Sequence, residues 1–197
     1  MLARLQQCVV ITVGLVAATW VAVLLGMERP GVALASAFVF LFGHSAVLAV
    51  EFILMSRANQ ADEAPRATAA QVLRAWLSES VTAPAVFCWR QPFRSRSVPD
   101  CIGSDARRGV LFVHGFVCNR ALWNPWLARL RAQGVPFIAV NLEPVFGSID
   151  AYSPIIEKAV RQLAEETGQP PLVVAHSMGG LAVRAWLRRY SADERVR

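Results

Sequence analysis

The residues best suited to covalent chemistry surround a serine at the end of an apolar run. Residues 172–180 read Leu-Val-Val-Ala-His-Ser-Met-Gly-Gly, so Ser177 follows four apolar residues and precedes a helix-like pattern. A serine attacks well when it projects from a sharp strand-to-helix turn with small neighbours and a helix N-terminus behind it. Ala175 and Gly179 supply small neighbours. The alternative is a serine that merely occupies a tight turn, but the strand-turn-helix context favours a nucleophile.

A second loop upstream has the composition that acyl transfer requires. Residues 109–113, Gly-Val-Leu-Phe-Val, predict a buried strand, and His114-Gly115-Phe116 leaves it as a loop with a permissive glycine. Acyl transfer needs two backbone N–H groups directed at the oxyanion that develops in the transition state. A loop of this kind is suited to provide one of them.

Together, residues 175–180 and His114-Gly115-Phe116 resemble the α/β-hydrolase superfamily, and within it the bacterial lipases and esterases. The resemblance spans roughly residues 85–190. It implies that the backbone N–H groups of Phe116 and Met178 form the oxyanion hole and that neither neighbouring histidine is the general base. The residues that it assigns to shaping the site are His114, Gly115, His176 and Gly179.

The other members of a catalytic triad are not found after the serine. The family order is serine, acid, histidine, and residues 178–197 contain no histidine. Asp193 and Glu194 lie in a segment typical of a solvated helix end, so no acid is assigned. We therefore expect the chain to hold the N-terminal part of a hydrolase. The alternatives are an inactive domain that serves as a membrane-tethered interaction module, and a non-lipase relative such as a thioesterase, amidase or haloperoxidase.

Strand and helix patterns alternate around the two motifs. Residues 90–106 have the composition of a basic loop. We expect strands at 85–89, 109–113, 135–142 and 171–175, and helices at 122–133 and 148–167 that end at Gly134 and Gly168. This alternation predicts an α/β fold with a mostly parallel sheet. The expected domain, 85–197, is an incomplete α/β-hydrolase domain.

Two apolar segments precede this domain. Residues 8–26 carry no charge and residues 32–55 carry only Glu51, so each is long enough to span a bilayer. The Pro30-Gly31 pair between them predicts a short turn. We therefore expect residues 1–57 to be a membrane anchor of two transmembrane helices. A cleaved signal peptide is the alternative for the first segment, and a buried hairpin of a soluble fold is disfavoured because neither segment has a polar face.

Two ionisable residues lie within the second apolar segment. His44 and Glu51 are seven residues apart and so share a helix face. One interpretation is a functional intramembrane pair. In the other, His44 is neutral and hydrogen-bonds a neighbouring helix or a carbonyl, while the Glu51 side chain reaches the membrane interface. The second interpretation is favoured.

Residues 58–84 are expected to contain a linker and an amphipathic helix. Residues 56–66 are polar and include Pro65, whereas residues 68–79 have apolar side chains at helical spacing. Such a helix lies on the bilayer with Trp76 at the headgroup level, or covers the sheet of the domain. The second arrangement is the more frequent one.

Charge predicts the membrane orientation. Arg4 precedes the first span and Arg57 and Arg66 follow the second, whereas the turn contains only Arg29, so both termini and the hydrolase domain are expected on the cytoplasmic side of a bacterial inner membrane. The net charge of +6 includes no run of five or more like charges, which argues against nucleic-acid binding and suits anionic headgroups.

The expected substrate is an ester, preferably of a lipid, with Phe116, Val117 and Trp123 lining an apolar acyl groove. No phosphate loop or dinucleotide motif is present, so no cofactor is expected. The four cysteines lack the spacing of a metal or redox motif, so no metal site is predicted either. They suit a reducing compartment. A disulfide between Cys88 and Cys101 becomes plausible only if the domain lies outside the cell.

Overall fold

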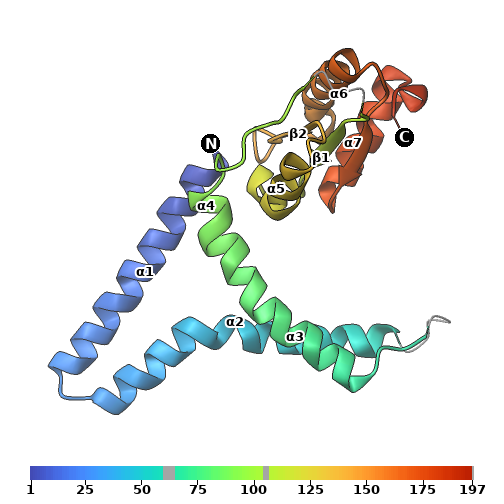
Figure 1. The fold of residues 1–197 in the computed structure, drawn as a ribbon. Coiled ribbons are helices and arrows are strands. Elements are labelled where there is room, and N and C mark those ends of the chain that lie inside the picture. Colours follow the sequence, from blue (N-terminus) through green and yellow to red (C-terminus); the bar gives the residue numbers. More distant parts are fainter. Residues whose placement is uncertain (60–64, 104–106, 197) are drawn as a thin grey trace. The chain divides into compact units, whose positions relative to one another are not determined.

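The computed structural model describes residues 1–59, 65–103 and 107–196 (Figure 1). Parts of the predicted linker and of the predicted basic loop, residues 60–64 and 104–106, lie outside the described residues. The chain divides into two compact units. One unit contains Cys8–Cys88, and the other combines Met1–Gln7 with Trp89–Arg197.

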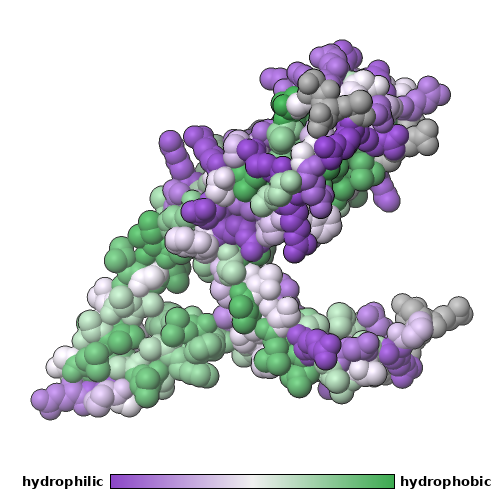
Figure 2. Space-filling model, viewed as in Figure 1, coloured by the Kyte–Doolittle hydropathy of each residue, from purple (hydrophilic) through white to green (hydrophobic). Residues whose placement is uncertain are grey.

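Two long apolar helices account for most of the first unit. Helix α1 spans Leu2–Gly26 and α2 spans Pro30–Ala58, with Pro30 in the first turn, where its missing N–H leaves no hydrogen bond unmade. Both predicted helices are confirmed, with wider bounds. By length and composition each is able to cross a membrane. Their side chains give these helices the predominantly apolar surface in Figure 2.

Helix α3 (Ala69–Pro84) packs against α2 within the same unit. It begins with a capping box in which Thr68 and Gln71 satisfy each other's backbone N–H groups. The indole Nε1 of Trp76 donates to the Ser45 carbonyl at 2.8 Å, and His44 Nε2 donates to the Ser80 carbonyl at 2.9 Å. His44 therefore pairs with a neighbouring helix and a carbonyl, as its structural interpretation predicts.

The prediction of a strand at 85–89 is wrong. The chain continues from α3 into a π-helix, Ala85–Arg90, followed by the short helix α4, Gln91–Phe93. The wider π turn directly follows Pro84, whose ring disrupts regular helical hydrogen bonding. A short apolar run such as Val86-Phe87-Cys88 fits a strand or a buried helical segment equally well, and the preceding helix decides between them.

A three-stranded parallel sheet forms the centre of the second unit. Its strands are β1 (Val110–Val113), β2 (Phe137–Ala139) and β3 (Leu172–Ala175), in the order β2-β1-β3. Phe112 of β1 lies opposite Ala139 of β2 and Val174 of β3. The strand predicted at 135–142 is thus much shorter in the structure.

Helices follow each strand and cover both faces of the sheet. Helix α5 (Asn124–Ala132) follows a 3-10 turn at Arg120–Trp123, and α6 (Ser153–Thr167) follows one at Ile149–Tyr152. Both α-helices begin next to a proline, which explains why the helices predicted at 122–133 and 148–167 start later. Helix α6 ends at Gly168, which has φ +68°. Helix α7 spans Met178–Tyr190, and a last 3-10 turn spans Asp193–Arg195.

Alternate residues of β1 point to opposite faces of the sheet. Leu111 and Val113 pack in a core with side chains of α6 and α7, whereas Phe112 packs with Trp123, Leu127 and Phe137 on the other face. The predicted α/β fold with a parallel sheet is confirmed.

One buried carboxylate ties α6 to α7. Glu157 of α6 is 7% exposed and accepts hydrogen bonds from Trp186 Nε1 at 2.9 Å and Arg195 Nη1 at 2.8 Å. Burial disfavours its charged form, but the hydrogen bonds from Trp186 and Arg161 and the charges of Arg195 and Arg161 keep the pKa of Glu157 below its ordinary value.

Candidate active site

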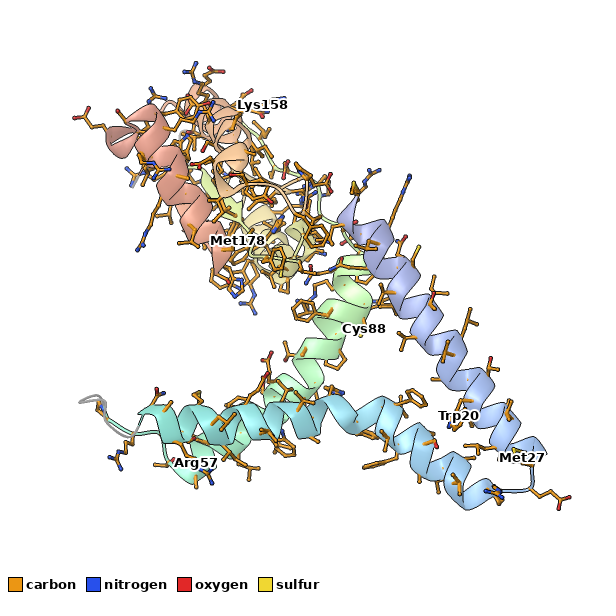
Figure 3. The ribbon with its side chains drawn as sticks, turned by 180° about the vertical axis from the view of Figure 1, so that it is seen from behind. Trp20, Met27, Arg57, Cys88, Lys158 and Met178 are labelled. Carbon is orange, nitrogen blue, oxygen red and sulfur yellow. The ribbon has the colours of Figure 1, made fainter. Side chains whose placement is uncertain are left out.

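Ser177 occupies a strained turn between β3 and α7. Its φ is +53° and its ψ is −127°, a conformation that side-chain-bearing residues rarely adopt. Hydrogen bonds on both sides hold the turn: His176 N–H donates to the Val113 carbonyl at 3.0 Å, and Gly179 N–H donates to the His176 carbonyl at 2.9 Å. The exposed Ser177 thus stands at the end of β3, directly before Met178. Figure 3 labels Met178 at the start of α7.

Gly179 is required because α7 approaches β1 very closely here. A Cβ atom on Gly179 would lie 2.6 Å from the His114 carbonyl oxygen and 2.7 Å from that of Val113. A Cβ atom on Gly180 would meet nothing within 4 Å. The close approach therefore needs a small residue at position 179 but not at position 180.

The upstream loop lies directly against this turn. A Cβ atom on Gly115 would lie 3.0 Å from Ser177 Cβ and 3.0 Å from His176 Nδ1. The fold therefore brings together the two motifs that the sequence separates, and the glycine at position 115 gives the loop its close approach to the serine.

The two expected oxyanion donors have free N–H groups. Across the described residues, the backbone N–H groups of Phe116 and Met178 donate to no acceptor. Two unpaired N–H groups in adjoining loops are available to a ligand oxygen.

His114 holds the upstream loop and is not free to exchange protons with Ser177. Its Nδ1 donates to the Gly115 carbonyl at 2.8 Å, and its Nε2 accepts from the Leu142 N–H at 3.0 Å. Burial lowers the pKa of this imidazole, which is 3% exposed. The neutral ring thus fixes the carbonyl of the peptide group whose N–H belongs to Phe116.

His176 and Trp123 contact each other through their rings, with centroids 6.5 Å apart and planes at 83°. His176 is exposed, whereas Trp123 is buried against Phe112 in the core. The expectation that Trp123 lines an acyl groove is therefore wrong, because its ring fills the layer between the sheet and α5.

Phe146, which sequence analysis did not name, forms an aromatic pair with Phe116 beside the upstream loop. The rings of Phe116 and Phe146 lie 5.9 Å apart, and these residues are 51% and 76% exposed. Phe146 follows β2 in a Pro-Val-Phe-Gly turn. Its position in the sequence, an aromatic residue in a turn after a predicted parallel strand, could have identified Phe146, because ligands bind at the carboxyl ends of such strands.

The described residues do not complete a triad. None of them hydrogen-bonds the Ser177 side chain, and the side chain of Asp193 is outside the described part. His44 belongs to the other compact unit. Within the described ranges the four cysteines are free, and no cluster of three His, Cys, Asp or Glu side chains is placed to bind a metal.

The parallel sheet, the strained serine turn and the adjoining glycine loop define an α/β-hydrolase-like domain. Residues 110–196 match the sequence model of the alpha/beta hydrolase family. The match runs from β1 through the serine turn to the last 3-10 turn. No curated protein matches the chain.

Proposed function

We propose that this protein is a membrane-anchored serine hydrolase that cleaves carboxylic esters, with Ser177 as its nucleophile. The observation that carries the proposal is the meeting of two loops. Ser177 stands at φ +53° with the Gly115 backbone against it, and the free N–H groups of Phe116 and Met178 belong to those same loops. A nucleophile beside two unpaired donors suits acyl transfer.

The reaction proceeds through an acyl-enzyme. Ser177 Oγ forms a bond to the ester carbonyl carbon, and the carbonyl electron pair moves onto oxygen, where the N–H groups of Phe116 and Met178 stabilise the charge. A general base takes the serine proton. The electron pair then returns from the oxyanion, the bond between the carbonyl carbon and the alcohol oxygen breaks, and the base delivers the proton to that oxygen. Water then cleaves the acyl-enzyme by the same route. Because both nitrogens of His114 are engaged, that histidine supports the donors and is not the base.

Lipid esters are the proposed substrates. Phe116 and Phe146 present an exposed apolar surface next to the proposed oxyanion donor, which suits the acyl chain of a substrate. Two helices long enough to span a bilayer are part of the same chain and would keep the domain near lipid.

We further propose that these helices form a hairpin with the catalytic domain on the cytoplasmic side of a bacterial inner membrane. Met1–Gln7 belongs to the same compact unit as Trp89–Arg197, which supports placing both on one side of the bilayer. The arginines near the span ends favour the cytoplasmic side.

Ester turnover by the natural gene product in lipid nanodiscs tests this function. We expect hydrolysis of p-nitrophenyl esters that favours longer acyl chains, and a fall on the order of 10⁶-fold in kcat for Ser177→Ala. Ser148→Ala is the matched control, because Ser148 makes no capping hydrogen bond in its helix turn. Retained turnover in Ser177→Ala would contradict the proposal, and an inactive wild type would favour an interaction module.

A further inference from the structure

We propose that Gln6, in the first turns of α1, is a positioning residue that holds the oxyanion loop through two linked peptide groups. The inference rests on the proposed function. It makes the seating of Met1–Gln7 on the domain a condition of hydrolysis.

Residues Met1–Gln7 contact the unit that contains Ser177 at several points. The Met1 ammonium group contacts Glu143 Oε1 at 2.7 Å, and this hydrogen bond holds the pKa of Glu143 below its ordinary value. Leu2 is 4% exposed, and Gln7 Nε2 donates to the Pro92 carbonyl at 2.7 Å. The first turn of α1 thus packs as a part of this unit.

Gln6 connects that turn to the oxyanion loop. Its Nε2 donates to the Val117 carbonyl at 3.1 Å and lies 3.4 Å from Gln91 Oε1, while its Oε1 accepts from Asn119 Nδ2 at 3.0 Å. Donor and acceptor partners on the two ends of the amide allow only one orientation. Gln91 is fully buried and also accepts from the Asn119 backbone N–H at 2.8 Å, which anchors the cluster.

Two planar peptide groups carry this contact to the proposed donor. The Val117 carbonyl that Gln6 holds shares its peptide plane with the Cys118 N–H, which donates to the Gly115 carbonyl at 3.3 Å. The Gly115 carbonyl in turn shares its plane with the Phe116 N–H. Fixing the Val117 carbonyl therefore limits the direction of the Phe116 N–H.

The loop needs such support because its backbone is strained. Val117 has φ +53°, a conformation that is a genuine outlier for a β-branched residue and persists only where surrounding contacts impose it. His114 holds the Gly115 carbonyl from one side at 2.8 Å, and Gln6 holds the Val117 carbonyl from the other. Without Gln6, the second peptide group loses its side-chain donor.

The test compares Gln6→Ala with Gln7→Ala in the natural gene product in nanodiscs, with p-nitrophenyl butyrate as substrate. Gln6→Ala loses the hydrogen bonds to Val117, Gln91 and Asn119, and Gln7→Ala loses the bond to Pro92 from the same helix turn. Only Gln6 contacts the loop. We expect Gln6→Ala to lower kcat about 10-fold with little change in KM, because the lost bond to Val117 supports a donor that acts in the transition state. A boronic acid that forms a tetrahedral adduct with serine should bind about 10-fold more weakly. Gln7→Ala should stay close to wild type in both measurements.

A thermal midpoint for each variant separates positioning from folding. Should Gln6→Ala unfold, Gln6→Glu replaces it, since the carboxylate still accepts from Asn119 but cannot donate to Val117. A folded Gln6 variant with the kcat of Gln7→Ala would overturn the positioning role of Gln6. If Ser177→Ala loses its turnover in the same experiment, the proposed hydrolase function still stands. Retained turnover in Ser177→Ala would instead overturn the hydrolase itself.

Discussion

Replacing Gly179 by alanine should damage the protein, whereas the same change at Gly180 should not. A Cβ atom at position 179 would lie 2.6 Å from the His114 carbonyl oxygen, and an ordinary contact begins at 3.4 Å. The start of α7 must therefore retreat by about 0.8 Å from the end of β1. A Cβ atom at position 180 meets nothing within 4 Å.

The two substitutions share one favourable effect, because alanine is preferred over glycine in a helix by roughly 0.5–1 kcal/mol. Overpacking of a rigid site costs about 1–3 kcal/mol. The free energy of unfolding should therefore be about 1–3 kcal/mol lower for Gly179→Ala than for Gly180→Ala. Movement of Ser177 and Met178 with the helix should also lower kcat, since a misplacement of about 1 Å can cost on the order of 10²-fold.

Tryptophan fluorescence during thermal unfolding in nanodiscs, together with ester turnover, measures both effects. Gly180→Ala should be as stable as the wild type or more so, with unchanged kcat. Equal stability and equal kcat in the two variants would refute the close approach of α7 to β1 and the reasoning built on it.

Three further outcomes are expected. Burial lowers the pKa of His114 below its ordinary value of 6.5, so as the pH falls His114 is protonated in the unfolded chain before it is protonated in the folded protein. The free energy of unfolding should therefore decrease as the pH drops below 6.5. The same pH series on His114→Phe should lack this decrease. Glu157→Ala should lower the free energy of unfolding by about 1–3 kcal/mol, because it leaves the buried Trp186 N–H unpaired, and denaturation that matches wild type would contradict this. A cytoplasmic reporter fused at the C-terminal end should be active, and activity of a periplasm-dependent phosphatase reporter there would reverse the proposed orientation.

The sequence predicted the elements whose signals are local. The apolar run before Ser177 and the glycines near it predicted a strand, a sharp turn and a helix, and the structure has β3, the strained turn and α7 there. Gly168 likewise marked the end of α6. These signals depend on a few adjacent residues, so a short stretch of sequence carries them.

The failures concern residues whose state depends on parts of the chain outside the local pattern. The run at 85–89 fits a strand, but it continues the helix that precedes it. Trp123 has the character of a groove residue, and its burial depends on packing against Phe112. The bonds of Gln6 to Val117 and Asn119 join residues more than a hundred positions apart, and no periodic pattern predicts such a contact.

The most direct test of the account is covalent labelling of the natural gene product with a fluorophosphonate, followed by mass spectrometry of its peptides. The account predicts a single adduct on Ser177, absent from Ser177→Ala and formed at the wild-type rate in Ser148→Ala. An adduct on another serine, or labelling that persists in Ser177→Ala, would contradict the assignment of the nucleophile.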